Sequence, residues 1–283
     1  MLSRVPHRRG RPQLTALLLV TLAPFVATGP ARAQSTPEKR PLEIADYALW
    51  RTISGSTISD DGRWVAWDYS RVRGDDTLHV KALDSDSAHV IASASSAEFS
   101  DDGRWVAYVI SPPFMEAEKL ERDGETVTRQ AGLLELATGE SLTWDEASSF
   151  GFSEGSSHFF VKKRQQDEDA EHDGTNLILR NLGEGFEELI GSVDEVEFNS
   201  GGTHLAFTVD AAGMDGNGVY LLDLATGSRR GLDNTKERFA RLTWSEEGDA
   251  LAVLHGVKPE QNVERENRLI AFRNVADSSP IRA

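Results

Sequence analysis

The sequence contains no cysteine among its 283 residues. No disulfide can therefore crosslink the chain, and no cysteine can carry a lipid anchor. A chain of this kind is held together by the burial of apolar side chains. The roughly 250 residues that follow the N-terminal segment are enough to form such a core.

Basic residues are scarce. The sequence has 30 Lys and Arg against 46 Asp and Glu, which gives a formal net charge of −16 at pH 7. Five of the arginines lie in the first 33 residues, where there is no acidic residue, so the rest of the chain carries −16 − 5 = −21. Such an acidic surface argues against nucleic acid and against anionic membranes as partners.

Long apolar runs are also scarce, and the N-terminus holds the one exception. The run Leu14–Val26 follows an arginine-rich start, and the small residues Ala31 and Ala33 frame a cleavage position. This pattern predicts a secretory signal peptide over residues 1–33, with an uncleaved N-terminal anchor as the alternative. No later stretch approaches the roughly 20 apolar residues of a transmembrane helix. We therefore expect an exported chain, periplasmic or secreted, that does not contact the membrane after cleavage.

A ten-residue pattern recurs five times along the chain. It begins at Ile58 (ISDDGRWVAW), Phe99 (FSDDGRWVAY), Phe152 (FSEGSSHFFV), Phe198 (FNSGGTHLAF) and Trp244 (WSEEGDALAV). The first two copies differ only at their first and last residues. The starts are 41, 53, 46 and 46 residues apart. Self-similarity at such a period indicates a repeat architecture.

Each copy predicts a strand, a polar turn and a second strand. Gly62 and Gly103 occupy the position where a type I turn with a bulge requires positive φ. The apolar stretch that follows, residues 64–67 in the first copy, predicts a strand buried on both faces. A second strand pair with its own turn follows most copies, for example around Ala225–Gly227. Each unit thus holds about four short antiparallel strands in 40 to 50 residues, as in a β-propeller blade.

The predicted fold is therefore all-β, a propeller of about five four-stranded antiparallel blades over residues 57–283. A lead-in segment, residues 34–56, precedes it. The fifth repeat stops after Arg273 without a fourth strand, so we expect an incomplete ring. Tyr47–Ile53 is a candidate to supply that strand. If blades are missing, the flanks of the end blades expose apolar surface and favour self-association.

Two stretches interrupt the strand pattern. Phe114–Arg122 (FMEAEKLER) has the period of a helix and predicts about two helical turns within a loop insertion. Gln165–Gly174 (QQDEDAEHDG) is an acidic loop that ends in an Asp-Gly turn. Neither changes the predicted fold class.

Gly151–Gly155 reads GFSEG and matches the G-x-S-x-G pattern of many serine hydrolases. A nucleophile elbow needs a strand before the serine and a helix directly after it. Ser153 instead aligns with Ser59, Ser100 and Ser245, the turn serines of other repeats, and a strand pattern follows it. We therefore interpret Ser153 as a turn residue whose hydroxyl bonds backbone amides.

No other residue forms a convincing site, so we predict no catalytic, cofactor-binding or metal-binding residue in this chain. His172 lies in the acidic loop, without the spacing of metal ligands. Asp215–Gly218 resembles the start of a calcium loop but lacks its later ligands. The tryptophans are interpreted as core, with a sugar-binding platform as the alternative. The histidines considered are His7, His79, His89, His158, His172, His204 and His255.

Four segments in order resemble a known family. They are PLEIADYALWRTISGSTISDDGRWVAW (Pro41–Trp67), TNLILRNL (Thr175–Leu182), GNGVYLLDLATG (Gly216–Gly227) and RLTWSEEGDALAVL (Arg241–Leu254). The chain from Pro41 to its end resembles the N-terminal β-propeller of exported bacterial serine peptidases of the prolyl oligopeptidase family, of the dipeptidyl aminopeptidase or acylaminoacyl peptidase type. The S-D-D-G-R-W-V-A element is shared with many propellers, including the Tol type, whereas the ordered set with its DYALWR leader is more specific.

The resemblance implies that an α/β-hydrolase domain with a Ser-Asp-His triad follows the propeller. It also implies that the propeller admits small or unstructured peptides and excludes folded proteins. The chain ends at Ala283 inside its fifth repeat, so no catalytic residue can be assigned here. We expect the substrate-gating portion of a peptidase that acts on peptides through that further domain.

Two alternatives from other classes stay open. One is a non-enzymatic periplasmic propeller of the Tol type that binds a protein or a ligand. The other is a complete five-bladed propeller, a shape that hosts some glycan-active enzymes with paired carboxylates. The number of repeats favours the last, but the unfinished fifth repeat and the lack of an acidic pair at a repeated inner position disfavour it.

Overall fold

The computed structural model describes residues 40–167, 169–214, 216–257, 266–277 and 281–282. The chain divides into two compact units, Met1–Leu42 and Glu43–Ala283, and every described helix and strand lies in the second. The predicted signal peptide, residues 1–33, lies outside the described residues. Among the residues described, none of the helices has the length and apolar character needed to cross a membrane.

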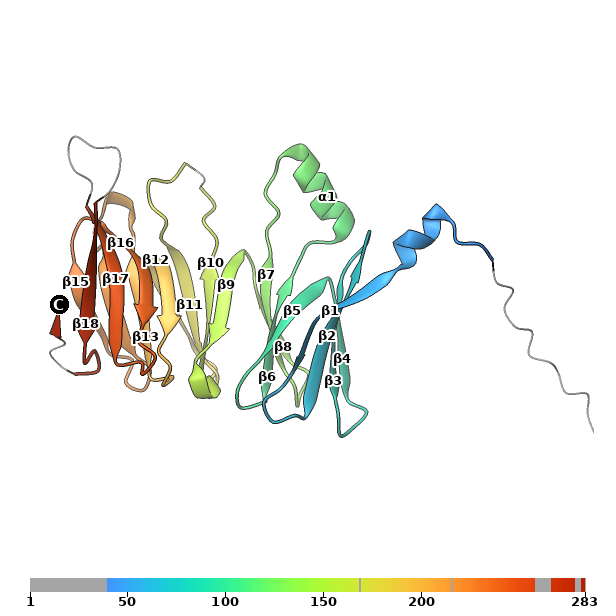
Figure 1. Cartoon of the computed structure of the whole chain (residues 1–283), viewed down its shortest axis with the longest axis horizontal. Helices are drawn as coiled ribbons and strands as arrows, with labels where there is room; N and C mark the ends of the chain where they lie inside the picture. The colour runs from blue at the N-terminus through green and yellow to red at the C-terminus, as the bar shows by residue number, and fades with distance from the viewer. Residues whose placement is uncertain (1–39, 168, 215, 258–265, 278–280, 283) are drawn as a thin grey trace, which may run out of the picture. The chain divides into compact units, whose positions relative to one another are not determined.

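Antiparallel strands make up most of the second unit (Figure 1). The helices among the described residues are η1 (Ile44–Leu49), α1 (Phe114–Asp123), η2 (Glu154–Ser156) and η3 (Ala212–Met214), and of these only α1 is an α-helix. The strands are β1 (Arg51–Ile58), β2 (Trp64–Arg71), β3 (Thr77–Ala82), β4 (Ala88–Ala92), β5 (Ala94–Phe99), β6 (Trp105–Ile110), β7 (Gln130–Glu135), β8 (Ser141–Trp144), β9 (Ala147–Phe152), β10 (His158–Lys163), β11 (Thr175–Asn181), β12 (Glu187–Phe198), β13 (His204–Val209), β14 (Gly218–Asp223), β15 (Arg229–Asn234), β16 (Arg238–Trp244), β17 (Ala250–Val257), β18 (Glu266–Arg273) and β19 (Ile281–Arg282).

The strands of the described residues form five successive four-stranded units, which we call blades. Three of them are β1–β4, β5–β8 and β16–β19. The third and fourth share β12 in a seven-stranded sheet of order β15-β14-β13-β12-β11-β10-β9. The first part of β12 is the last strand of the third blade, and its second part, after a register shift between Val193 and Val196, begins the fourth. The all-β class and the four-stranded antiparallel units are confirmed.

The blade boundaries differ from the repeat boundaries. β1 begins at Arg51, within the segment that we separated as a lead-in, and Ile53 pairs with Tyr69 of β2 in the first blade. The reason is that the ten-residue pattern marks the turn between the first and second strands of a blade, so each blade starts one strand earlier. The end of the segment Tyr47–Ile53, residues 51–53, thus belongs to the first blade and does not supply the fourth strand of the last blade.

Two local predictions have different outcomes. The helical period at Phe114–Arg122 is confirmed by α1, which lies in the loop between β6 and β7. The prediction that the last blade lacks a fourth strand is wrong. Its fourth strand is β19, in which Ile281 pairs with Arg273 and Arg282 pairs with Phe272. A strand of two residues is too short to leave a periodicity in the sequence.

The core consists of four clusters, each filling the space between two consecutive blades. We call the face of a blade toward the preceding blade its front and the opposite face its back. Leu78 and Val80 on the back of the first blade, for example, pack with Val106 and Tyr108 on the front of the second. Among the described residues, none of these clusters joins the first blade to the last.

Burial of the second strand depends on whether a neighbour covers both faces of its blade. Residues 105–108 of β6 and 158–161 of β10 are all buried, as predicted. The same prediction for residues 64–67 is wrong, because only Ala66 is buried and the other three are half-buried. No described blade covers the front of the first blade, so its second strand alternates between buried and half-buried residues.

The turn of the second repeat shows how the motif works. Ser100 Oγ accepts a hydrogen bond from the Trp105 N–H at 2.9 Å and donates one to Asp102 Oδ1 at 2.7 Å. Gly103 has φ of 65°, as predicted for this turn. A Cβ at Gly103 would lie 2.8 Å from Oδ2 of Asp61 in the neighbouring turn. The glycine therefore provides both a left-handed backbone and room for the adjacent blade.

We expect Gly103→Val to lower the free energy of unfolding by about 1–3 kcal/mol, the usual cost of a residue held in an unfavourable backbone region. Gly62→Val is the matched control, because Gly62 has φ of 68° but nothing within 4 Å of its added Cβ. Its loss should be smaller, since it carries the backbone strain alone. Denaturant unfolding followed by tryptophan fluorescence measures both. Wild-type stability of Gly103→Val contradicts the account.

Candidate functional site

Ser153, the one residue that matched a catalytic motif, is buried in a turn. Its Oγ accepts the His158 N–H at 2.9 Å and donates to the His158 carbonyl at 3.3 Å. Ser59 and Ser100 accept the equivalent N–H groups, from Trp64 at 3.0 Å and Trp105 at 2.9 Å. The predicted turn hydrogen bonds of Ser153 are thereby confirmed. The three-residue η2 and then β10 follow it, in place of the long helix of a nucleophile elbow.

The strand histidines lie in packed or hydrogen-bonded surroundings. Burial lowers the pKa of His158, whose Nδ1 lies 2.9 Å from Ser157 Oγ. Burial also lowers the pKa of His204, although the charge of Asp223 opposes this. Three other histidines stack on aromatic rings, namely His79 on Trp67, His89 on Trp64 and His255 on Phe239.

Polar residues from three blades meet around Arg238, the first residue of β16. Its Nε and Nη2 donate to Asp194 Oδ2 on β12 at 3.2 and 3.0 Å, and its Nη1 lies 2.5 Å from Asp173 Oδ2. Asp210, which follows β13, accepts the Asp173 N–H at 2.9 Å and an Asn217 amide N–H at 3.2 Å. We call Asp173, Asp194, Asp210 and Arg238 the Arg238 cluster.

The electrostatics of the Arg238 cluster reflect its partial burial. Burial raises the pKa of the Asp194 carboxyl, and the charge of Arg238 partly opposes this. Burial lowers the pKa of the nearby Lys162, against the charges of Asp194, Asp173 and Glu195. Ligand atoms of the three aspartates lie within 4.8 Å of one another, a spacing that a cation can use. Arg238 already supplies that positive charge to two of them.

A cavity of about 450 Å³ lies beside this cluster. Its wall includes the predicted acidic loop, with Asp167, Asp169 and Glu171, together with His172 and Lys236. The Nδ1 of His172 is buried without a hydrogen-bond partner. The segment Asp215–Gly218, which resembles the start of a calcium loop, lies nearby and is described only in part. Asp215 lies outside the described residues, and Asn217 is buried against Asp210.

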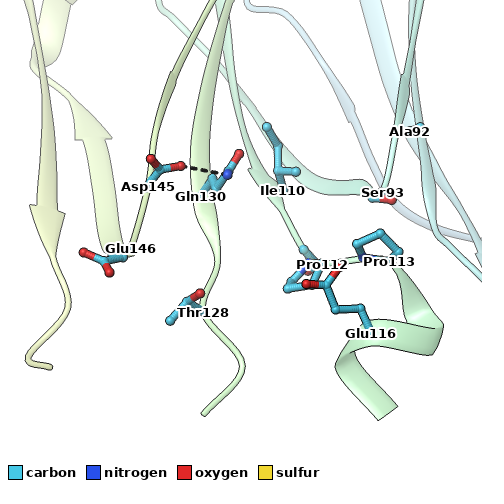
Figure 2. A pocket seen from close by; sticks show the side chains of 11 residues that line it. Ala92, Ser93, Ile110, Pro112, Pro113, Glu116, Thr128, Gln130, Asp145 and Glu146 are labelled. Atoms are coloured by element: carbon cyan, nitrogen blue, oxygen red, sulfur yellow. Dashed lines mark hydrogen bonds between the residues drawn. The ribbon is translucent and has the colours of Figure 1, made fainter. Parts of the chain in front are cut away.

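A larger cavity, of about 630 Å³, lies at the same end of the second blade, where α1 leaves the sheet (Figure 2). Figure 2 shows Glu146 on one side of it and Glu116, from α1, on the other. Asp145 accepts a hydrogen bond from the Gln130 side chain at 2.7 Å, which fixes one wall. Pro113 contributes an apolar surface, and no described lining residue is basic. This composition suits a ligand with an amine or another cationic group.

Both cavities were missed by sequence reasoning. Their lining comes from loops between second and third strands and from connections between blades, which are distant in the sequence. A weak local signal exists for the Arg238 cluster. Asp194 and Asp210 each follow an apolar stretch, in LIGSVD and LAFTVD, and a carboxylate in such a context is a candidate for a partly buried charge that needs a partner.

Comparisons with known proteins give structural matches only. No family model and no curated protein sequence matches this chain. The β-propeller domain of the trilobed protease from Pyrococcus furiosus matches with a TM-score of 0.46 and 14% identity, over 83% of this chain and 71% of that one. An acylaminoacyl peptidase from Pyrococcus horikoshii matches with a TM-score of 0.42 and 15% identity, over 80% of this chain. An oligogalacturonate lyase in complex with manganese matches with a TM-score of 0.44 and 15% identity, over 80% of this chain and 63% of that one.

The chain spans 39% of the length of that acylaminoacyl peptidase and 35% of a prolyl endopeptidase that it also matches. These structural neighbours are β-propeller-containing peptidases of the prolyl oligopeptidase family, together with the lyase.

We expect Arg238→Met to lower the free energy of unfolding at pH 7 by about 1–3 kcal/mol, because it leaves a partly buried carboxylate without its donors. The exposed pair Arg63 and Asp84, 3.4 Å apart, provides a control, and Arg63→Met should have almost no effect.

The loss in Arg238→Met should depend on pH. Burial raises the pKa of Asp194 above 3.8, so the folded chain holds that proton more tightly than the unfolded chain, and this contribution is lost as the pH rises through the folded pKa. Removing Arg238 raises the pKa further. The loss should therefore shrink as the pH falls toward about 4. Unfolding curves at several pH values measure this, and a pH-independent loss contradicts it.

Proposed function

We propose that this chain is the propeller portion of an exported serine peptidase of the prolyl oligopeptidase family. The observation that carries the proposal is the ordered set of four sequence segments, from the DYALWR leader to RLTWSEEGDALAVL. In the structure the leader forms η1 and the start of β1, and the later segments form strands of the third, fourth and fifth blades. The set therefore runs through most of the chain in one order.

The leader offers a second line of support. Ile44, Tyr47, Leu49 and Trp50 are all exposed, although they are apolar. The rings of Tyr47 and Trp50 lie 4.6 Å apart and form a small aromatic surface. Apolar surface of this kind on an otherwise acidic protein is typical of a contact with another domain or protein. A catalytic domain outside this chain is the partner that the proposal requires.

In this role the chain contributes selection by size, and the bond chemistry belongs to the catalytic domain. In the whole propeller, blades arranged around a central channel would admit an extended peptide and would exclude a folded protein. The acidic lining at Glu116, Asp145 and Glu146 would favour peptides with a free amine or a basic side chain. Such a filter changes which substrates reach a nucleophile without altering the reaction itself.

A binding propeller without catalytic activity is the second candidate. It is supported by the two cavities described above, which have volumes of about 630 and 450 Å³ and polar, acidic linings. Residues of this chain alone form both cavities, so a ligand could bind without a further domain. The two candidates differ in what the gene encodes after the codon for Ala283 and in what the whole protein cleaves.

We expect the genomic DNA after the Ala283 codon to continue in frame and to encode G-x-S-x-G, then Asp and His. The product of that longer gene should take up a serine-directed phosphonate at one serine beyond residue 283 and should cleave short peptides but not folded proteins. The 283-residue chain is the matched control and should take up no probe, as measured by intact mass spectrometry. A stop codon at this point favours the binding propeller, and labelling of Ser153 contradicts its assignment to a turn.

Export is tested separately. Expressed in a bacterium with its natural start, the chain should be found in the periplasmic fraction or the medium, and its N-terminus should be Gln34. Replacing two leucines of the apolar run, Leu17 and Leu18, by arginine should keep the chain in the cytoplasm with an intact N-terminus. Recovery of an unprocessed chain in the membrane fraction supports an N-terminal anchor and contradicts cleavage.

A further inference from the structure

The first strand of the third blade, β9, has a straight edge that other first strands lack. β1, β5, β9 and β16 each lie at the end of a sheet, so one edge of each pairs with no described strand. Register shifts interrupt β1, β5 and β16 near the middle, for example between Ser95 and Glu98 in β5. Such bulges disrupt an edge and protect it from pairing with another chain. In β9 the shift lies near the start, so residues 149–152 pair one for one with residues 159–162 of β10.

Side chains from the neighbouring blade occupy backbone amides beside two of these bulges. The Ser96 N–H donates to Asp68 Oδ2 at 3.1 Å. The Leu242 N–H donates to Glu195 Oε2 at 2.6 Å. In β9 the Ser148 hydroxyl instead turns back to its own blade, where it donates to the carbonyl of a β10 residue at 3.1 Å. Among the described residues, the free edge of β9 is therefore open to a further partner.

The alternation of an antiparallel strand shows which groups of β9 are free. Ser153 directs its N–H toward β10 and donates to the His158 carbonyl at 2.9 Å. Every second residue before it points the same way, so Phe150 and Phe152 direct their N–H and C=O groups away from β10. Gly151 lies between them and has no side chain, which leaves room for the main chain of a ligand to approach.

A carboxylate lies beside this edge. Glu98 pairs with Ala107 across β5 and β6, which places both residues on the back of the second blade. Ala107 belongs to the core cluster against which Phe150 and Phe152 pack, so Glu98 lies on the blade face that meets the front of β9. Burial raises the pKa of the Glu98 carboxyl, and the charge of Asp101 raises it further. A cationic group beside Glu98 would therefore be favourable.

We propose that β9 binds an extended peptide as an added antiparallel strand, with an arginine or lysine of the peptide directed toward Glu98. Peptide residues opposite Phe150 and Phe152 would exchange backbone N–H and C=O hydrogen bonds with them. Residues directly opposite each other share a face, so the peptide side chains at these positions point toward the second blade and its carboxylate. This inference goes beyond the proposed function, because a peptide can bind the edge whether or not a catalytic domain follows.

Fluorescence anisotropy of the 283-residue chain tests the proposal with a labelled heptapeptide of alternating valine and arginine. Salt at about 150 mM screens the long-range attraction between this peptide and the acidic surface. Two derivatives keep the same charge, one N-methylated at the arginine amides and the other at the valine amides. The first should bind at least about tenfold more weakly than the parent peptide, because methylation removes the N–H groups that face β9. The second should bind like the parent, because its methyl groups face away from β9.

Proline substitutions locate the contact on the chain. Phe150→Pro removes a free N–H without removing a hydrogen bond of the β9–β10 ladder, and it should weaken binding of the parent peptide at least about tenfold. Phe150→Ala loses the same packing but keeps the N–H, so it should bind like the wild type. Val90→Pro is the matched control on a different edge strand, β4, where the N–H of Val90 also points away from its neighbour β3. It should also bind like the wild type.

The carboxylate is tested in the same assay. Glu98→Gln should weaken binding about threefold, as expected for the loss of one partly exposed ion pair. Glu197→Gln is the control, because Glu197 has the same strand position in the fourth blade, where it pairs with Ala206, and its binding should be unchanged. Circular dichroism checks that each variant is folded, and the methylated peptides decide the question if Phe150→Pro is not. Absence of binding, equal binding of the two methylated peptides, or a loss in Val90→Pro without one in Phe150→Pro overturns the proposal.

Discussion

Coverage of both faces of each blade is the constraint on which this structure depends. The second strands of the middle blades are apolar at successive positions, so neither face of such a sheet can remain in water without a large loss of hydrophobic stabilisation. Neighbouring blades cover each other, with small residues such as Ala107 on one face and bulky residues such as Phe159 on the other. The two end blades have a similar pattern of apolar residues, although each has only one face covered among the described residues.

The fold class could be predicted because its signals are local. The turn around Ser100 and Gly103 is closed by hydrogen bonds within a few residues, so a short pattern is enough to identify it. The same locality identified Ser153 as a turn residue despite its G-x-S-x-G surroundings. The burial of Trp67 could not be predicted, because it depends on what lies next to the blade and not on the strand itself.

The candidate sites could not be predicted for a related reason. The Arg238 cluster takes its members from three blades, and only the packing of those blades brings Asp173, Asp194 and Arg238 within hydrogen-bonding distance. Its partial burial then sets the direction of the pKa shift at Asp194. The spacing of these residues in the sequence does not predict that they meet, because the connecting loops differ in length from one blade to the next.

The two ends of the blades differ in how far their loops can vary in sequence and length. The end with the repeat turns maintains the fold, and the other end can vary to bind ligands. At the end with the repeat turns, Ser59, Ser100 and Ser153 are buried and hydrogen-bonded, so a change there disturbs the blade. At the other end the loops vary from a short turn to α1 and the acidic loop, and the carboxylates of Glu116 and Asp145 face cavities. Ligand recognition can therefore vary at that end, while the blade faces remain available for contacts with further blades.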